Sequence, residues 1–314
     1  MTTVLNFPEQ ITFYLTIFLG VLVSCSLIFG VFHKVKPSSL TLNLVQRTNS
    51  WWVIYILFIL FIGVSRELIY IGFALISFIS HREMVSNIDL PLTSRRTVFW
   101  SYLAIPIHYY FAYSGNLILF LTFLPVATLF LLSLRTIIED EPEKSLQVFA
   151  GLHWSLMMTT FTISHVAYLA SMPTVPGHEN GYYSLFFFLI FLTSTNDIFQ
   201  YIAGKIFGKK KISPKISPNK TYAGFFGGII GSAGLGYAFS SSMPLAQSQC
   251  IVLAVVISIT GFIGDLNISA IKRYLNVKDM SNFIPGHGGI LDRIDSLTFS
   301  SIAYFYLVYY WIYV

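Results

Sequence analysis

The stretch ITFYLTIFLGVLVSCSLIFGV, Ile11–Val31, is a long and predominantly apolar run without a single charged side chain. A helix of this length is sufficient to cross a bilayer hydrocarbon core of about 30 Å. No Lys or Arg precedes the run, and no small-residue cleavage site follows it. We therefore expect a retained membrane helix here and not a signal peptide.

Apolar runs of this kind recur along the 314 residues, of which 55% are hydrophobic and only 11% are charged. A soluble domain usually carries about 25% charged residues. The pattern predicts an all-α integral membrane protein, a polytopic bundle of about ten transmembrane helices. The predicted helices lie near residues 11–32, 51–65, 67–80, 97–113, 115–134, 148–170, 183–203, 223–240, 249–266 and 297–314. The second and third share one apolar stretch interrupted by Arg66 and Glu67, so a single long helix is an open alternative.

Basic side chains gather in alternate loops. Residues 204–222 carry six lysines, whereas residues 171–182 and 241–249 carry no Lys or Arg. The positive-inside rule then places the basic loops in the cytoplasm and both termini outside. We expect a multi-pass protein of the cell (inner) membrane, with N-terminal transmembrane helices over 1–180 and a C-terminal catalytic region over 181–314.

Two other classes of function are not indicated. The net charge of +5 lies in short loops and forms no aromatic-rich basic surface, so no nucleic-acid partner is expected. Cys25 and Cys250 both lie inside apolar runs and offer neither metal-ligand spacing nor a plausible disulfide.

Three polar clusters lie at the predicted cytoplasmic ends of helices. They are Ser194–Asp197, Ser217–Thr221 and the long stretch Gly264–Asp295. Ionisable groups at a membrane helix end are costly and are by default functional candidates. We therefore place the chemistry of the protein in these three clusters.

Helical spacing groups the ionisable residues of the third cluster. Asp265 and Lys272 are separated by i, i+7, and Asp292 and Asp295 by i, i+3, so each pair shares a helix face. Carboxylates beside basic side chains suit a Mg²⁺–polyphosphate site, because the acids bind the cation and the bases neutralise phosphate oxygens. The pair Gly288–Gly289 would expose backbone N–H groups to phosphate as a nest.

Some of these features have a structural interpretation. We expect the lysines Lys209–Lys211 to act only as an ordinary topology signal. For Lys278 and Asp279, a surface ion pair is the alternative to a role in substrate binding. The glycine-rich run Gly224–Gly236 is more typical of close helix packing than of ligand contact.

The segment SAIKRYLNVKDMSNFIPGHGGILDRID, Ser269–Asp295, resembles the signature of the phosphatidate cytidylyltransferases, or CDP-diacylglycerol synthases, over 27 positions. The resemblance continues upstream through Asn196–Asp197 and through Ser217-Pro218-x-Lys220-Thr221. It covers roughly the C-terminal third of the chain, and the N-terminal helices only by hydropathy.

The resemblance implies transfer of CMP from CTP to phosphatidate, giving CDP-diacylglycerol and pyrophosphate for phospholipid biosynthesis. Mg²⁺ would be the cofactor, with a second cation left open. Its ligands would be Asp265 and Asp292, with Asp295 as a further candidate. Lys220, Lys272 and Arg273 would contact phosphates. The remaining substrate-binding candidates are Ser217, Asn219, Thr221, Ser269, His287, Gly288, Gly289, Asp197 and Lys278. The implied partners are CTP, phosphatidate and membrane lipids, and a homodimer is left open.

One position departs from the family pattern. Many members have Gly-Asp-x-x-Glu-Ser, whereas this chain has Ile268 at the position of the Glu. This difference predicts a divergent subgroup and leaves open another lipid phosphate as substrate or an inactive regulatory relative. An intramembrane aspartyl protease using Asp197 and Asp265, and a transporter, are the alternatives from other classes.

Overall fold

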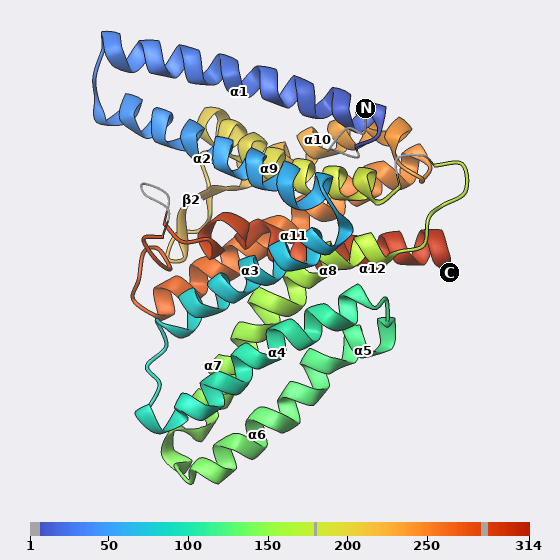
Figure 1. The fold of residues 1–314 in the computed structure, drawn as a ribbon. Coiled ribbons are helices and arrows are strands. Elements are labelled where there is room, and N and C mark those ends of the chain that lie inside the picture. The colour runs from blue at the N-terminus through green and yellow to red at the C-terminus, as the bar shows by residue number, and fades with distance from the viewer. Residues whose placement is uncertain (1–6, 179–180, 284–287) are drawn as a thin grey trace.

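A computed structural model describes residues 7–178, 181–283 and 288–314 of the protein, which form a helical bundle (Figure 1). Its helices are α1 (Glu9–Val35), α2 (Ser39–Gly63), α3 (Arg66–Val85), α4 (Arg95–Tyr113), α5 (Leu117–Thr122), α6 (Thr128–Glu139), α7 (Pro142–Leu156), α8 (Thr162–Tyr168), α9 (Gly181–Phe207), α10 (Tyr222–Ala238), α11 (Gln247–Tyr274) and α12 (Leu291–Tyr313). Short 3₁₀ turns lie at Leu92–Ser94, Leu169–Ser171 and Ser240–Ser242.

Two of the predicted helices contain a π-helical segment. Phe123–Ala127 joins α5 to α6, and Met157–Phe161 joins α7 to α8. When these are counted as continuous, the described residues form ten helical stretches near the ten predicted positions. Six stretches are long and apolar enough to cross a membrane: α1, α2 from Leu44, α3, Leu117–Glu139, α9 and α11. The prediction of a helical membrane protein is confirmed, but ten membrane spans are not.

The helices α2 and α3 are separate, which decides between the two alternatives left by the sequence. The Ser65 hydroxyl accepts a hydrogen bond from the Leu68 N–H at 3.4 Å and caps α3. The helix α2 begins twelve residues earlier than predicted, behind a capping box in which Ser38 and Thr41 bond reciprocally at 3.2 and 3.0 Å. The polar side chains of this first part of α2 hid it from a search for apolar runs.

The all-α prediction also lacked one element. The strands β1 (Lys211–Ser213) and β2 (Ser217–Thr221) pair antiparallel in a small hairpin between α9 and α10. The Thr221 hydroxyl then accepts a hydrogen bond from the Gly224 N–H at 3.1 Å and begins α10. The hairpin therefore ends directly at a helix cap.

The helices α9, α10, α11 and α12 pack against one another and carry the polar clusters. The glycine-rich α10 lies so close to α9 that a Cβ at Gly228 would be 2.6 Å from the Gln200 Cγ. Asn196 of α9 accepts hydrogen bonds from Ser232 of α10 at 3.3 Å and from Ser258 of α11 at 2.6 Å. The glycine run thus serves helix packing, as its composition indicated.

The main hydrophobic core draws on both halves of the chain. Leu152 of α7, Phe186 of α9 and Tyr304 of α12 are all completely buried in it. The described helices on either side of residue 180 therefore stabilise each other, and the division into two regions stays a prediction.

Candidate active site

Three helices and the hairpin bring four ionisable side chains together at one end of the bundle. The Lys220 ammonium of β2 lies 2.6 Å from an Asp265 carboxylate oxygen of α11. Burial alone would lower the pKa of Lys220, but the negative charges of Asp265, Asp197 of α9 and Asp295 of α12 outweigh it and raise that pKa. We call these four residues the carboxylate cluster. Three acids share one lysine in it, so the carboxyl groups of the cluster outnumber its cationic group.

Neighbouring hydroxyls orient two of the acids. The Ser296 Oγ donates to Asp197, with its carboxylate oxygens at 3.0 and 3.2 Å. The Ser269 Oγ donates to Asp265 at 3.2 Å across one turn of α11. These bonds hold the carboxylates in place while leaving them further lone pairs for a ligand.

Gln200 is a member of the site that the sequence analysis did not select. Its Oε1 accepts a hydrogen bond from the Lys220 ammonium at 3.0 Å, and its buried Nε2 has no hydrogen-bond partner among the described residues. The side chain lies one turn beyond Asp197 on α9, which is the only signal that would have found it. Gln200 thus positions Lys220 and offers an amide donor beside the cluster.

Asp292 has a different environment from the cluster acids. Its Oδ1 accepts a hydrogen bond from the Lys272 ammonium at 2.7 Å. Its Oδ2 accepts from the Met280 N–H at 2.8 Å and from the Gly289 N–H at 3.0 Å. Asp292 therefore fastens the segment between α11 and α12 to the start of α12.

Glu83 of α3 fastens the same segment from the other side. Its buried carboxylate accepts from the Ser281 hydroxyl at 2.7 Å and from the N–H groups of Ile290 and Leu291 at 2.9 Å each. The side chain amide of Asn87, one turn further, donates to the Met280 carbonyl at 2.8 Å. The N–H groups at the start of a helix lack partners within the helix and favour an anion, so Glu83 caps α12.

We call Glu83, Asn87 and Asp292 the loop clamp. The sequence analysis did not select Glu83 for the site, because about two hundred residues separate it from the residues it binds and no local spacing links them. Figure 1 shows α3 alongside α11 and the segment that leads into α12.

The glycine pair closes the clamped loop. Gly288 has a positive φ of 80°, and a Cβ at Gly289 would lie 2.5 Å from a Glu83 carboxylate oxygen. The N–H of Gly289 is already donated to Asp292. Both glycines are therefore required by the loop itself, and their role as a phosphate nest stays a prediction.

Ile268, the departure from the family pattern, packs beneath the clamp. It is fully buried in a small apolar cluster with Met84, Met280 and Leu291. Ile268 therefore contributes apolar support to the loop and is not part of the carboxylate cluster.

The other predicted residues surround these two sets. Thr221 is buried as the α10 cap, and Ser217 and Asn219 lie on β2. Arg273 is exposed, and its Nε donates to the Ile216 carbonyl at 3.3 Å, which ties α11 to the hairpin. Lys278 is exposed in the loop, and His287 lies outside the described residues.

The donor set of the carboxylate cluster fits a hard divalent cation, because Asp197, Asp265 and Asp295 all supply carboxyl oxygens, the ligands that such a cation prefers. No three His, Cys, Asp or Glu side chains among the described residues converge as a complete metal cage. Mg²⁺ commonly takes one or two carboxylates and completes its shell with water and substrate phosphates. The site therefore fits a cation that arrives with a nucleotide.

The geometry also bears on the aspartyl protease alternative. A protease dyad shares one proton between two carboxyl groups. Here Asp265 is paired with the Lys220 ammonium at 2.6 Å. A dyad that works by sharing a proton between two carboxyl groups has no need of such an ammonium, whereas a site for phosphate groups does.

Comparison with known proteins agrees with the signature. Residues 45–311 match the cytidylyltransferase family. An uncharacterized protein, YnbB, of Escherichia coli (strain K12) is 37% identical over 268 residues, which cover 84% of this chain and 87% of that protein. The phosphatidate cytidylyltransferase of Bacillus subtilis (strain 168) is 36% identical over 158 residues, or 46% of this chain and 58% of that enzyme. The phosphatidate cytidylyltransferase of Haemophilus influenzae is 39% identical over 142 residues, or 41% of this chain and 49% of that enzyme. The chain thus spans about half the length of these two enzymes.

Proposed function

The chain belongs to the cytidylyltransferase family, and on that premise we propose that it transfers the cytidylyl group of CTP to phosphatidate, giving CDP-diacylglycerol and pyrophosphate. The family membership confirms the enzyme class predicted from the signature, a nucleotidyltransferase that uses CTP. The phosphatidate substrate is supported by the names of relatives that match about half of the chain.

The observation that carries the proposal is the carboxylate cluster with its single lysine. In the proposed reaction, a phosphate oxygen of phosphatidate attacks the α-phosphorus of CTP, and the bond from that phosphorus to the β-phosphate oxygen breaks. Both reactants are anions, so the principal tasks of the enzyme are charge neutralisation and alignment. A site that combines cation ligands with a buried ammonium supplies both.

The side chains divide these tasks in the proposed site. Asp265, with Asp197 or Asp295, would hold Mg²⁺ through one or two carboxylates, and the bound cation would supply electrophilic stabilisation of charge on the phosphate oxygens. Lys220 contributes a positive charge that the three acids keep protonated. Asp292, predicted as a second metal ligand, remains a candidate, and in the structure it secures Lys272 beside the cluster.

We place the site at the cytoplasmic side of the cell membrane. The distribution of charge supports this placement. The lysine-rich segment 204–222, which contains the hairpin, lies at the same end of the bundle as the carboxylate cluster. CTP is then available from the cytoplasm, and the lipid phosphate reaches the site from the membrane.

The test is direct. Protein purified in detergent is incubated with radiolabelled CTP, Mg²⁺ and phosphatidate, and lipid-extractable label is measured. The proposal predicts labelled CDP-diacylglycerol together with one pyrophosphate per turnover. A panel of lysophosphatidate, isoprenyl phosphate and phosphatidate then identifies the lipid class. No labelled lipid from any member of the panel, under conditions in which the Bacillus subtilis enzyme is active, would refute the proposal.

A further inference from the structure

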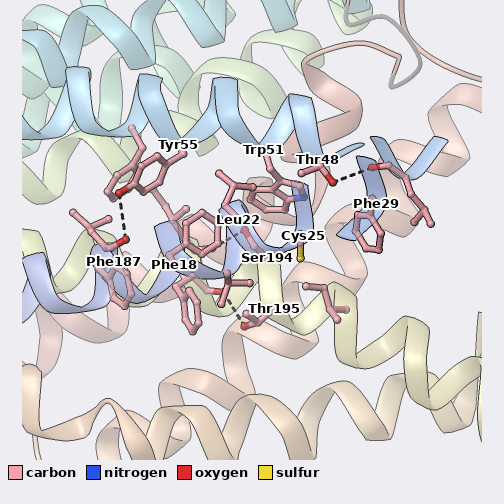
Figure 2. Close-up of a pocket in the computed structure, with 17 residues that line it drawn as sticks. Phe18, Leu22, Cys25, Phe29, Thr48, Trp51, Tyr55, Phe187, Ser194 and Thr195 are labelled. Atoms are coloured by element: carbon pink, nitrogen blue, oxygen red, sulfur yellow. Dashed lines mark hydrogen bonds between the residues drawn. The ribbon is translucent and has the colours of Figure 1, made fainter. Parts of the chain in front are cut away.

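A cavity of about 490 Å³ lies between α1, α2 and α9 (Figure 2). Leu22 and Cys25 of α1 line it opposite Trp51 and Tyr55 of α2, with Phe191 and Ser194 from α9. Its volume falls within the range of about 300–1,000 Å³ that is typical of small-molecule sites. Neither the carboxylate cluster nor the loop clamp contributes to its wall.

The hydroxyl groups of the wall are already bonded to the backbone. The hydroxyls of Ser194, Thr195 and Thr48 donate to carbonyls one turn earlier at 2.8, 2.8 and 2.9 Å. The Tyr55 hydroxyl donates to the Leu15 carbonyl of α1 at 3.2 Å. These groups therefore present carbon atoms to the interior, and the wall selects an apolar occupant.

The cavity adjoins the proposed site through α9. Its α9 wall extends from Phe187 to Ile198, a stripe about 16 Å long at 1.5 Å per residue. Asp197 follows Ile190 of this stripe by seven residues, or about 700° at about 100° per residue. The two side chains therefore leave the helix in directions that differ by only about 20°. The carboxylate thus lies at the edge of the apolar stripe, near its end on the side of the hairpin.

From this continuity we propose that the cavity binds an acyl chain of the lipid phosphate substrate. The inference rests on the proposed function, because it assigns the tail of the same molecule whose phosphate reacts at the carboxylate cluster. A chain that begins beside Asp197 follows α9 toward Phe187, away from the charged end of the bundle. The phosphodiester of an ordinary membrane lipid offers a cation-bearing cluster fewer charged oxygens than the phosphomonoester of phosphatidate, so the location favours a lipid with a terminal phosphate.

Cys25→Trp fills the cavity from α1 with an apolar side chain, and Leu27→Trp is its matched control. Leu27 lies on the same helix but is 65% exposed and is not among the residues that line the cavity. We measure kcat/KM for dioleoyl and dihexanoyl phosphatidate. Cys25→Trp is expected to lower the ratio of long-chain to short-chain kcat/KM about tenfold, the effect of expelling about two methylene groups. Leu27→Trp is expected to leave the ratio unchanged.

A second measurement does not depend on turnover. Phosphatidate with a diazirine in the middle of its acyl chain is photolysed with the protein, and labelled peptides are mapped. We expect labelling of α1 around Leu22–Cys25 and of α9 around Phe187–Ser194, lost in Cys25→Trp and retained in Leu27→Trp. Unlabelled phosphatidate should compete, and phosphatidylcholine should not.

The outcomes separate the two proposals. If the wild type transfers cytidylyl groups but the two variants share one chain-length ratio and one labelling pattern, the cavity assignment is wrong. Equal competition by phosphatidylcholine would also overturn it, because the cavity would then be a general lipid site. If the wild type shows no transfer while phosphatidate labelling behaves as expected, the proposed reaction fails and the lipid site stands.

Discussion

The carboxylate cluster and the loop clamp both contain partly or fully buried acids at one end of the bundle, yet they are bonded in different ways. Glu83 and Asp292 of the clamp each accept three hydrogen bonds. Four of the six donors are backbone N–H groups of the segment 280–291, one is the Ser281 hydroxyl of that segment, and one is the Lys272 ammonium of α11. In the cluster, three acids surround the ammonium of Lys220, and Lys272 adds a second positive charge near Asp295.

This difference in hydrogen bonding indicates that the two sets of acids have different roles. A carboxylate whose oxygens are satisfied by fixed donors stabilises a conformation, as in the clamp. Acids that outnumber the cationic groups beside them are neutralised by a proton or by a further cation, and Mg²⁺ that arrives with a nucleotide would be such a cation. The two sets should therefore respond differently to neutralisation of one acid, and the following variants test this from the largest expected effect to the smallest.

Asp265→Asn removes the charge paired with Lys220 and has the largest expected effect. We expect cytidylyl transfer to fall about 10³-fold, the scale of losing a main electrostatic contact to the reacting groups. The melting temperature should fall less than in Asp292→Asn, because Asp197 and Asp295 remain as acids around the Lys220 ammonium. Retained activity would contradict the proposed role of Asp265 in binding the cation.

Lys220→Met removes the positive charge of the cluster and is expected to reduce transfer about 10²-fold. The matched control is Lys215→Met, because Lys215 is exposed in the same hairpin between β1 and β2. The control should keep full activity. Equal losses in the two variants would mean that the general charge of the hairpin is what matters.

Asp292→Asn leaves the buried ammonium of Lys272 without its ionic partner. We expect the free energy of unfolding to fall by about 3 kcal/mol, as for other broken buried ion pairs. Activity should fall with it, because the loop and Lys272 both lose their anchor. Denaturation in detergent and initial rates measure the two effects, and a loss of activity at unchanged stability would assign Asp292 to the cluster instead.

Glu83→Gln has the smallest expected effect of the series. Three hydrogen bonds to a charged acceptor become weaker or are lost, which should cost about 1–3 kcal/mol of stability. Transfer should fall by about tenfold or less through poorer positioning of the loop. Glu67→Gln is the control, because Glu67 is exposed at the start of the same helix. Identical changes of stability and transfer in the two variants would show that Glu83 does not hold the loop.

The sequence predicted the parts of the site whose residues are linked by local spacing. Asp265, Lys220 and Asp197 lie in short motifs at helix ends, and the structure brings them together. The helical class and the approximate positions of the helices also followed, because apolar runs directly reflect burial in a membrane.

The remaining features depend on contacts that no local pattern encodes. Glu83 reaches the start of α12 across about two hundred residues, and Gln200 is recognised only by its contact with Lys220. The beginning of α2 was missed because capping by Ser38, and not an apolar run, defines it. The hairpin was missed because its strands have three and five residues and carry polar side chains.

The most direct test of the division between the two sets is cation binding itself. Mn²⁺ replaces Mg²⁺ as a paramagnetic probe, and its binding in the presence of CTP is measured by electron paramagnetic resonance in the wild type, Asp265→Asn and Glu83→Gln. We predict that Asp265→Asn loses the CTP-dependent Mn²⁺ signal and that Glu83→Gln keeps it with little change in affinity. Retention of the signal in Asp265→Asn together with its loss in Glu83→Gln would contradict the account.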